Sequence, residues 1–447
     1  MNKLNQLLKT LGPGLLYAGA AIGVSHLVGS TKAGAKFSFL LLLCIPLIHI
    51  IKYPFYKFGP QYTAITGRNI LHGYRALGKW ALATYIGMTM LAMCLIQAAV
   101  TIVTSSIAVK FFKLDIPAQY MPHIPAIFVL LLAATILYVG KYSLLDKVMK
   151  FVIIILTATT LFALGAVLLN APGGFYPSSP TPFFDFSSYA DALFLAAFLG
   201  WMPAPMDITV WHSVWSEEAN RESGEKANLK KAMLDFKVGY IGTAILAMCF
   251  LSLGALVMYG SGETPSQSGV AFAGQLIQLY TQALGPWAYP LIGIAALATM
   301  VSTTLTCLDA YPRTLDESFL IWKGESEGAE RKADSKKIYR IVLLAAVTGT
   351  IIIFLFFLKN MSQIVTLATV VAFVSAPILA LINHLVMNGS TIPKSDQPSS
   401  LMKNWSRLGI LILTIFSIWY IWIAFIRESP APINPPEPNP QVQNARK

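Results

Sequence analysis

The sequence predicts an all-α polytopic membrane protein with about eleven transmembrane helices, and three properties of its 447 residues support this. Hydrophobic residues make up 55% of the chain and charged residues only 12%, about half the share that covers a soluble domain. Mean hydropathy is +0.61, and apolar runs of about 20 residues, long enough to cross a bilayer as helices, recur along the chain. Runs such as Phe39–Ile51 and Ile341–Leu358 lack the alternation of membrane β-strands, so we expect helices.

The apolar runs predict one transmembrane transporter domain, residues 1–426, and a polar, proline-rich tail, residues 427–447, that we expect to be disordered. Two halves of five helices, near residues 14–170 and 189–386, would form an inverted repeat, with residues 405–426 as an extra helix. The expected spans are residues 14–36, 38–57, 81–108, 121–140, 145–170, 189–214, 237–259, 286–310, 339–358, 363–386 and 405–426.

Basic residues gather on one side of the expected membrane. With the N-terminus inside, 24 of the 33 Lys and Arg residues fall in cytoplasmic segments and 8 in outer segments, while Lys52 lies within a span. The positive-inside rule therefore predicts a cytoplasmic N-terminus and an outer C-terminal tail, in what we take to be a prokaryotic inner membrane. This distribution accounts for the net charge of +12 without a nucleic-acid partner. The expected partners are the bilayer and a small transported solute, and the oligomeric state is left open.

The hydrophilic segments are too short for a soluble catalytic domain. The largest, Glu217–Lys237 and Lys323–Arg340, carry mixed charges. HExxH and GxSxG motifs and clustered acid pairs are absent, and the four cysteines lie far apart inside apolar runs without a CxxC. We therefore expect no enzyme activity, no cofactor and no cleavable signal peptide.

Two spans contain residues that interrupt a helix. The first holds the run Ala20–His26 around Gly23, and the sixth holds Gly200–Asp207, where two prolines remove two backbone donors. Broken helices at corresponding positions of two repeats are the best sequence indication of a midplane binding site in such transporters. Freed carbonyls, including those near Ala20 and Gly23, could ligate a cation there. The alternative is a pair of kinks that bind no ligand.

Asp207 is the one acid that the expected boundaries place well inside a span. A carboxylate at membrane depth is costly and is functional by default, so we predict that Asp207 binds or couples the substrate. The alternative is that its side chain caps the N-terminus of the second half-helix. Both roles could hold together.

Sulfur and imidazole side chains lie beside the same breaks. His26 is in the first break, and Met202 and Met206 flank the prolines of the second. Such residues usually fill a core, but thioether and imidazole groups are also ligands for transition metals. We predict that all three contact the substrate and that Asp207, Met202 and His26 are the metal ligands if the substrate is a metal ion. His212 could relay protons or be a structural histidine.

Other polar residues could line the substrate pathway. Ser302 and Thr303 in the eighth span would either face an ion site or hydrogen-bond to carbonyls of their own helix. Thr369 in the tenth span and Thr209 in the sixth are expected near the same cavity. Gln97 is the strongly polar residue in the middle of the third span, which has no acid.

The chain resembles the Nramp family of divalent-metal transporters over most of its length. Gly12–Gly14 resembles the family's opening GPG, and Thr66–Asn69 resembles its TG(R/K)(D/N) stretch. Met202–Pro203 falls where the sixth helix of the family has MPH, and Ser302–Thr306 resembles its SSTxTG run. The order and spacing of these motifs imply the LeuT-type inverted-repeat fold, with helices 1 and 6 discontinuous.

The chain departs from this family at the metal site. The family's DPGN motif reads Gly23–His26 here, so the aspartate ligand is absent and His26 stands at the asparagine. The methionine ligand is retained as Met202, Ala204 replaces the histidine after the proline, and the tenth-helix glutamine falls on Thr369. The acids that the family uses for proton transfer in the third helix have no counterpart, so proton coupling by that route is expected to be lost.

Two functions follow from these observations. The first is a divalent-cation transporter in which Asp207 replaces the lost charge; a His, Met and Asp donor set suits Mn, Fe, Co or Zn better than Mg. The second is a carrier of a small organic solute, such as an amino acid, on the same scaffold. Loss of the first-helix carboxylate favours an uncharged or anionic substrate, because the N-termini of half-helices attract anions.

Overall fold

The structure is a computed structural model that describes residues 12–117, 120–139, 142–170, 183–224, 228–259, 265–266, 268–324, 335–357 and 361–423. Every regular element in these ranges is helical, as the sequence predicts. The tail expected to be disordered, residues 427–447, lies outside the described residues.

The helices overlap the expected spans and include both interruptions, although α4 and α13 extend well past the expected ends at residues 57 and 310. They are, in chain order, α2 (Pro13–Ala21), η1 (Val24–Ser30), α3 (Thr31–Phe37), α4 (Cys44–Thr66), α5 (Ile70–Leu77), α6 (Lys79–Phe111), α7 (His123–Val139), α8 (Tyr142–Asn170), α9 (Tyr189–Gly200), α10 (Ile208–Ser223), α11 (Leu229–Leu253), η3 (Gly254–Met258), α12 (Gly269–Leu284), α13 (Ala288–Lys323), α14 (Ser335–Ile352), η4 (Ile353–Phe357), α15 (Met361–Met387) and α16 (Ser400–Ile421). The elements labelled η are π-helices. The sequence did not predict α5 and α12, which lie between expected spans.

Six helical stretches among the described residues are long and apolar enough to cross a membrane on their own. They are Lys79–Phe111, Leu229–Met258, Ala288–Lys323, Lys337–Phe356, Ile364–Met387 and Ser400–Ile421. Shorter apolar helices include His123–Tyr138, Ile154–Leu169 and Tyr189–Gly200. The chain is therefore an integral membrane protein, while the count of eleven spans stays a prediction.

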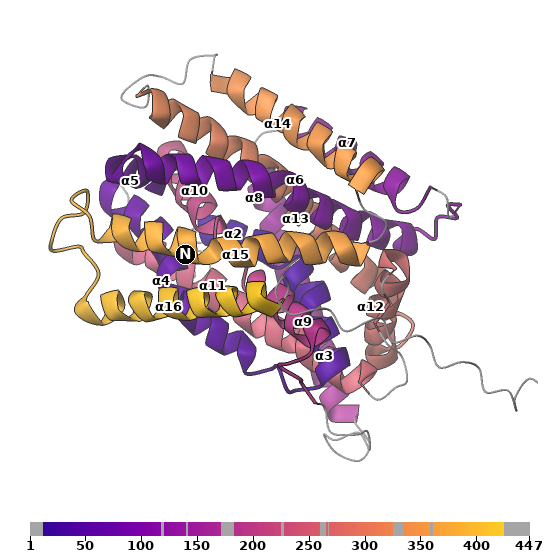
Figure 1. Cartoon of the computed structure of the whole chain (residues 1–447). Helices are drawn as coiled ribbons and strands as arrows, with labels where there is room; N and C mark the ends of the chain where they lie inside the picture. Colours follow the sequence, from indigo (N-terminus) through magenta and orange to yellow (C-terminus); the bar gives the residue numbers. More distant parts are fainter. Residues whose placement is uncertain are drawn as a thin grey trace, which may run out of the picture.

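Long helices run side by side through the bundle (Figure 1). α13 packs along α6 at its centre, with α14 and α7 on one side and α15 and α16 on another. α4 lies between α10, α11 and α16, and the short helices α2 and α3 pack against α11 and η3. The pieces of the two broken spans are thus enclosed by longer helices.

Glycines allow the broken first span to approach its neighbours closely. A Cβ on Gly34 of α3 would lie 2.0 Å from the carbonyl oxygen of Leu251, and one on Gly254 would lie 2.3 Å from that of Thr31. Small residues at membrane helix contacts let backbones meet, which supplies dispersion energy where lipid weakens the hydrophobic effect. The position of α3 therefore depends on Gly34 and Gly254.

The start of α2 is held by a side chain from far along the chain. The carboxylate of Asp235 on α11 accepts hydrogen bonds from the backbone N–H groups of Gly12 (3.1 Å) and Gly14 (2.6 Å). An anion at a helix N-terminus satisfies free donors and interacts favourably with the helix dipole. This contact gives the Gly12–Gly14 motif a structural role.

We expect Gly34→Ala to lower the stability of the purified protein by about 1–3 kcal/mol, because the added methyl group must push α3 away from α11. Gly87→Ala on the exposed side of α6 is the matched control, since a Cβ there meets nothing within 4 Å. The control should be neutral or stabilising by up to ~1 kcal/mol. Thermal unfolding in detergent measures both, and equal melting temperatures would contradict the close contact.

Candidate functional site

Both predicted helix breaks are present. α2 ends at Ala21, and η1 begins at Val24 after two non-helical residues. α9 ends at Gly200, and α10 begins at Ile208, so the residues around the two prolines are not helical. These breaks lie within spans, which leaves backbone groups without partners in their own helix.

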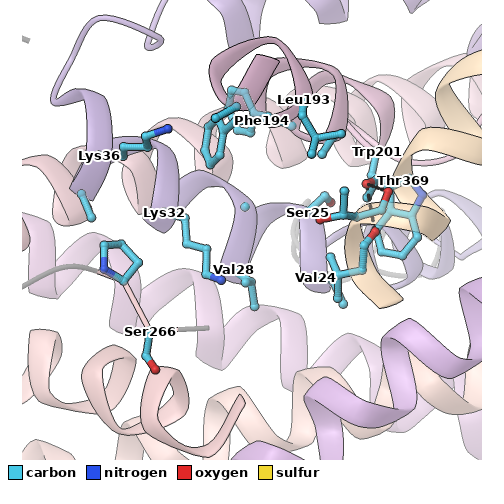
Figure 2. Close-up of a pocket in the computed structure, with 18 of the residues that line it drawn as sticks. Val24, Ser25, Val28, Lys32, Lys36, Leu193, Phe194, Trp201, Ser266 and Thr369 are labelled. Atoms are coloured by element: carbon cyan, nitrogen blue, oxygen red, sulfur yellow. Dashed lines mark hydrogen bonds between the residues drawn. The ribbon is translucent and has the colours of Figure 1, made fainter. Parts of the chain in front are cut away.

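A cavity of about 780 Å³ leads from one end of the bundle to the breaks. We call it the vestibule. Figure 2 shows Ser25, Trp201 and Thr369 together at one end of it, with Lys32 and Lys36 toward the other. Its volume lies within the range of small-molecule binding sites. Thr369, a predicted site residue, thus lines a cavity that reaches both breaks.

The vestibule is apolar and positively charged. Among the described residues that line it, two are lysines and none is acidic. The ammonium group of Lys36 forms an ion pair of 2.8 Å with Asp191, and that of Lys32 lies 4.7 Å from the ring centre of Phe272. Phe194 adds aromatic surface to the wall. Asp191 thus neutralises Lys36, which leaves Lys32 as the main source of positive charge among the described lining residues.

A second, much smaller void of about 20 Å³ lies between the breaks, and it has room for about one water molecule. Ala20, Trp201 and Thr303 are among the residues that line it. The hydroxyl of Thr303 donates to the carbonyls of Gly19 (3.2 Å) and Thr299 (3.0 Å). A Cβ on Gly23 would lie 2.8 Å from the Thr303 side chain, so only glycine lets α13 cover the first break.

Asp207 lies at the start of α10, with 7% of its surface exposed. Its side chain makes no capping hydrogen bond to the helix, so the capping alternative is not supported. Within the described part of the chain, its Oδ1 atom has no hydrogen-bond partner. Buried side chains of Tyr85 and Tyr311 lie near the carboxylate and interact with it electrostatically. Asp207 is therefore a buried acid with one unpaired carboxylate oxygen, which is costly to bury.

Burial alone does not distinguish Asp207, which corrects the expectation that it is the one deeply placed acid. Asp235 and Asp309 are each only 4% exposed, because α11 and α13 carry them into the bundle. Both have partners, however. Asp235 binds the start of α2, and Asp309 accepts two hydrogen bonds from Arg313, of 2.9 and 3.0 Å. Asp207 differs from both by its place at the start of α10, directly after the sixth-span break.

The two histidines near the breaks are fully buried. Nδ1 of His26 lies 2.8 Å from the hydroxyl of Ser25, and its Nε2 has no partner among the described residues. His212 stacks on Tyr17 with a ring separation of 5.6 Å, and neither of its ring nitrogens has a partner in the described ranges. Each imidazole therefore keeps a free nitrogen that a ligand or a proton could use.

The predicted metal ligands line neither the vestibule nor the smaller void. Met202 and Met206 are 0% and 1% exposed, and neither they nor Asp207 and His26 line the vestibule or the smaller void. Among the described residues, no group of three His, Cys, Asp or Glu side chains could hold a metal ion. The ligand set stays a prediction.

Three predicted pathway residues are buried in hydrogen-bonded positions. The hydroxyl of Thr209 donates to the carbonyl of Phe55 (2.9 Å), which ties α10 to α4. The amide nitrogen of Gln97 donates to Thr101 (3.0 Å), while its oxygen has no partner in the described chain. Ser302 lies on the buried side of α13. None of the three lines the vestibule.

The opposite end of the bundle is closed by polar contacts. Asn69 donates to the carboxylates of Glu217 and Glu317, joining the start of α5 to α10 and α13. The hydroxyl of Ser213 accepts a hydrogen bond of 2.7 Å from the backbone of Ile70. Burial raises the pKa of the Glu217 carboxyl, which lies beyond the expected span. The Thr66–Asn69 motif therefore helps to seal this end.

Comparison with known proteins identifies the family. The profile described as "Natural resistance-associated macrophage protein-like" matches residues 14–423. The chain belongs to the Nramp family. It is 36% identical over 416 residues to the uncharacterized protein PM0681 of Pasteurella multocida (strain Pm70), covering 92% of this chain and 91% of that protein.

Solved structures show the fold of this Nramp-family chain. A mutant of the Eremococcus coleocola manganese transporter aligns with a TM-score of 0.68 and 15% identity, covering 97% of this chain and 90% of that one. MhsT in complex with L-phenylalanine aligns with a TM-score of 0.53 and 17% identity, covering 92% and 97%. Both likenesses support the predicted LeuT-like fold.

Ala197→Cys should react readily with a charged thiol reagent, because this half-buried residue of α9 lines the vestibule. Its neighbour Ala196, which is 0% exposed and packs beside Phe373 and Tyr420, is the matched control. With the four native cysteines replaced by alanine, we expect the rate at position 197 to be roughly tenfold higher, since thiol reactivity follows access. Equal rates in detergent-solubilised protein would contradict the vestibule.

Proposed function

We propose that this protein is a secondary transporter that carries a divalent metal cation across the membrane by alternating access. Membership of the Nramp family supports this, as does the fold shared with a protein whose name is manganese transporter. The observation that carries the proposal is the vestibule, which is open at one end of the bundle and stops at two helix breaks. The comparisons do not favour the organic-solute alternative.

The structure then represents one state of the transport cycle. With the N-terminus cytoplasmic and the C-terminus outside, as the basic residues predict, the vestibule opens outward. Asp235 and Asn69 make the contacts that close the cytoplasmic side. Transport would require these contacts to break while the vestibule closes, within an inverted-repeat domain in a prokaryotic inner membrane.

The substrate would bind between the breaks, with Asp207, Met202 and His26 as ligands. In this state their side chains lie behind the vestibule, so a rotation of α10 or η1 would have to bring them to the ion. The remaining proposed contacts and pathway residues are Ala20, Gly23, Met206, Thr369, His212, Thr209, Gln97, Ser302 and Thr303. A donor set of carboxylate, thioether and imidazole groups suits Mn, Fe, Co or Zn.

One observation favours the second candidate, a small organic anion. Among the described residues that line the vestibule, two are lysines and none is acidic. Asp191 pairs with Lys36, and the charge of Lys32 favours a carboxylate-bearing solute over a free divalent cation. The cavity of about 780 Å³ is also larger than a bare ion needs. This candidate predicts solute uptake without metal.

We expect Asp207→Ala to reduce Mn²⁺ uptake into proteoliposomes by roughly tenfold to a hundredfold, because a hydrogen bond or ligand contact to a buried charge is worth about 1.5–3 kcal/mol. Asp396→Ala is the matched control, since Asp396 is an exposed acid in the loop before α16. Metal uptake that survives the loss of Asp207 would contradict the proposed ligand.

The same vesicles can separate the two candidates. Uptake of Mn²⁺ by the wild type supports metal transport, whereas uptake of an amino acid or another carboxylate without any metal flux contradicts it. A matched panel of labelled solutes should therefore be measured beside the metal, under the same ionic conditions.

We also expect Mn²⁺ influx to cause little acidification of the vesicle lumen. α6 has no acid along its length, and Gln97 is its strongly polar buried residue, so the family's third-helix proton route is missing. A pH-sensitive dye inside the vesicles measures this. Acidification that follows metal influx and persists in His212→Ala would contradict the expectation.

A further inference from the structure

The break of the sixth span already holds a positive charge. Lys52 on α4 is 0% exposed, and its ammonium group donates hydrogen bonds to the carbonyls of Leu199 (2.9 Å), Gly200 (3.1 Å) and Met202 (2.9 Å). An ammonium group has three donors, so these carbonyls satisfy all of them. They belong to the end of α9 and to the break itself.

Helix geometry explains why these carbonyls need a cation. The last carbonyls of a helix have no partner in their own helix, and they carry the negative end of its dipole. Pro203 stands where the N–H group that would bond to the Leu199 carbonyl should be, and it has none. The break therefore presents several carbonyl oxygens at a buried place, where unpaired polar groups are costly, and in the described chain a backbone N–H group reaches only that of Leu199 among the three, from Met202 at 3.3 Å.

A second side chain of α4 also binds a carbonyl of this break. One turn beyond Lys52, the hydroxyl of Tyr56 donates to the carbonyl of Ala204, so two side chains on one face of α4 bind four carbonyls around the prolines. Close contact with α10 is possible because Gly59 has no side chain, and a Cβ there would lie 2.2 Å from the carbonyl oxygen of Thr209. The ammonium group is thus held in a fixed place.

We infer that the break of the sixth span is a carbonyl-lined cation site whose occupant is the chain's own Lys52 ammonium group. The ammonium group of Lys52 occupies the three carbonyls that could otherwise coordinate a free cation. The end of α9 therefore needs no inorganic ion to keep its shape. The substrate must then bind without these three carbonyls, so the carbonyl of Met202 is not among its ligands. The inference does not depend on the substrate being a metal.

Chemical rescue tests this directly. Lys52→Ala removes the ammonium group together with three methylene groups, and it leaves a channel that propylammonium matches in length and charge. We expect the variant to melt at a lower temperature than the wild type and to regain stability with propylammonium, but not with tetramethylammonium, which has no N–H donor. Uptake of the solute that the wild type carries should rise roughly tenfold with propylammonium, as a few charged hydrogen bonds are restored.

Two controls make the outcome decisive. Lys57→Ala, at a half-buried position of α4, should respond to neither amine. Lys52→Met fills the channel with an apolar side chain of similar length, so this variant should fold, lose uptake and not respond to propylammonium. If Lys52→Ala does not fold, the uptake of Lys52→Met tests the inference instead. Wild-type uptake in either Lys52 variant without amine, or folded Lys52→Ala that propylammonium neither stabilises nor reactivates, would overturn the inference. Because the melting experiment uses no substrate, it tests the role of Lys52 even if the protein transports no metal.

Discussion

Backbone groups inside a membrane must find partners within the protein, and the two helix breaks are where this requirement is hardest to meet. Each break is served by one long neighbouring helix. α4 supplies Lys52 and Tyr56 to the carbonyls of the sixth span, and α13 supplies the hydroxyl of Thr303 to the carbonyl of Gly19 in the first. Side chains thus bind several of the carbonyls in and beside the breaks. The same need places glycines at the contacts. A Cβ on Gly200 would lie 2.6 Å from the carbonyl oxygen of Thr369, so a larger residue there would push α15 away from the vestibule.

Much of the fold could be predicted from local sequence. Apolar runs mark the spanning helices, and the prolines after Gly200 mark a break, because both signals act within about 20 residues. α12 was missed because Gly269–Leu284 is short for a span and carries polar residues. The roles of Asp235 and Lys52 were missed for a different reason. Each acts on backbone more than a hundred residues away in the sequence, and no local pattern shows which carbonyl or N–H group a buried charge will meet.

For the candidate site, the sequence predicted the position of the helix breaks but not the arrangement of the side chains. The breaks are where the sequence placed them, but the side chains named as metal ligands line neither the vestibule nor the smaller void. A sequence gives the order of side chains along a helix but not the rotation of the helix about its axis. Half a turn of rotation would move a side chain from the wall of a cavity into the packed core. Lys32 and Lys36 were visible as basic residues at a span end. Both lysines face the vestibule, and Asp191 neutralises Lys36. Neither fact could be predicted, because each depends on how α3 packs against α9.

Charge at the sixth-span break decides what the site can hold. The lysines of the vestibule lie in an open cavity, where water and salt screen their repulsion of a cation over about 8–10 Å. Lys52 is buried beside the break, where such screening is weak, so its charge acts on any ion bound there. Asp207 follows the same break and carries the opposite charge. A divalent cation would bind there only if it lay closer to the Asp207 carboxylate than to the Lys52 ammonium group. The three carbonyls that accept hydrogen bonds from Lys52 offset part of its positive charge with their dipoles. If both proposals hold, the Lys52 ammonium group maintains the shape of the break and the Asp207 carboxylate supplies the affinity for a cation.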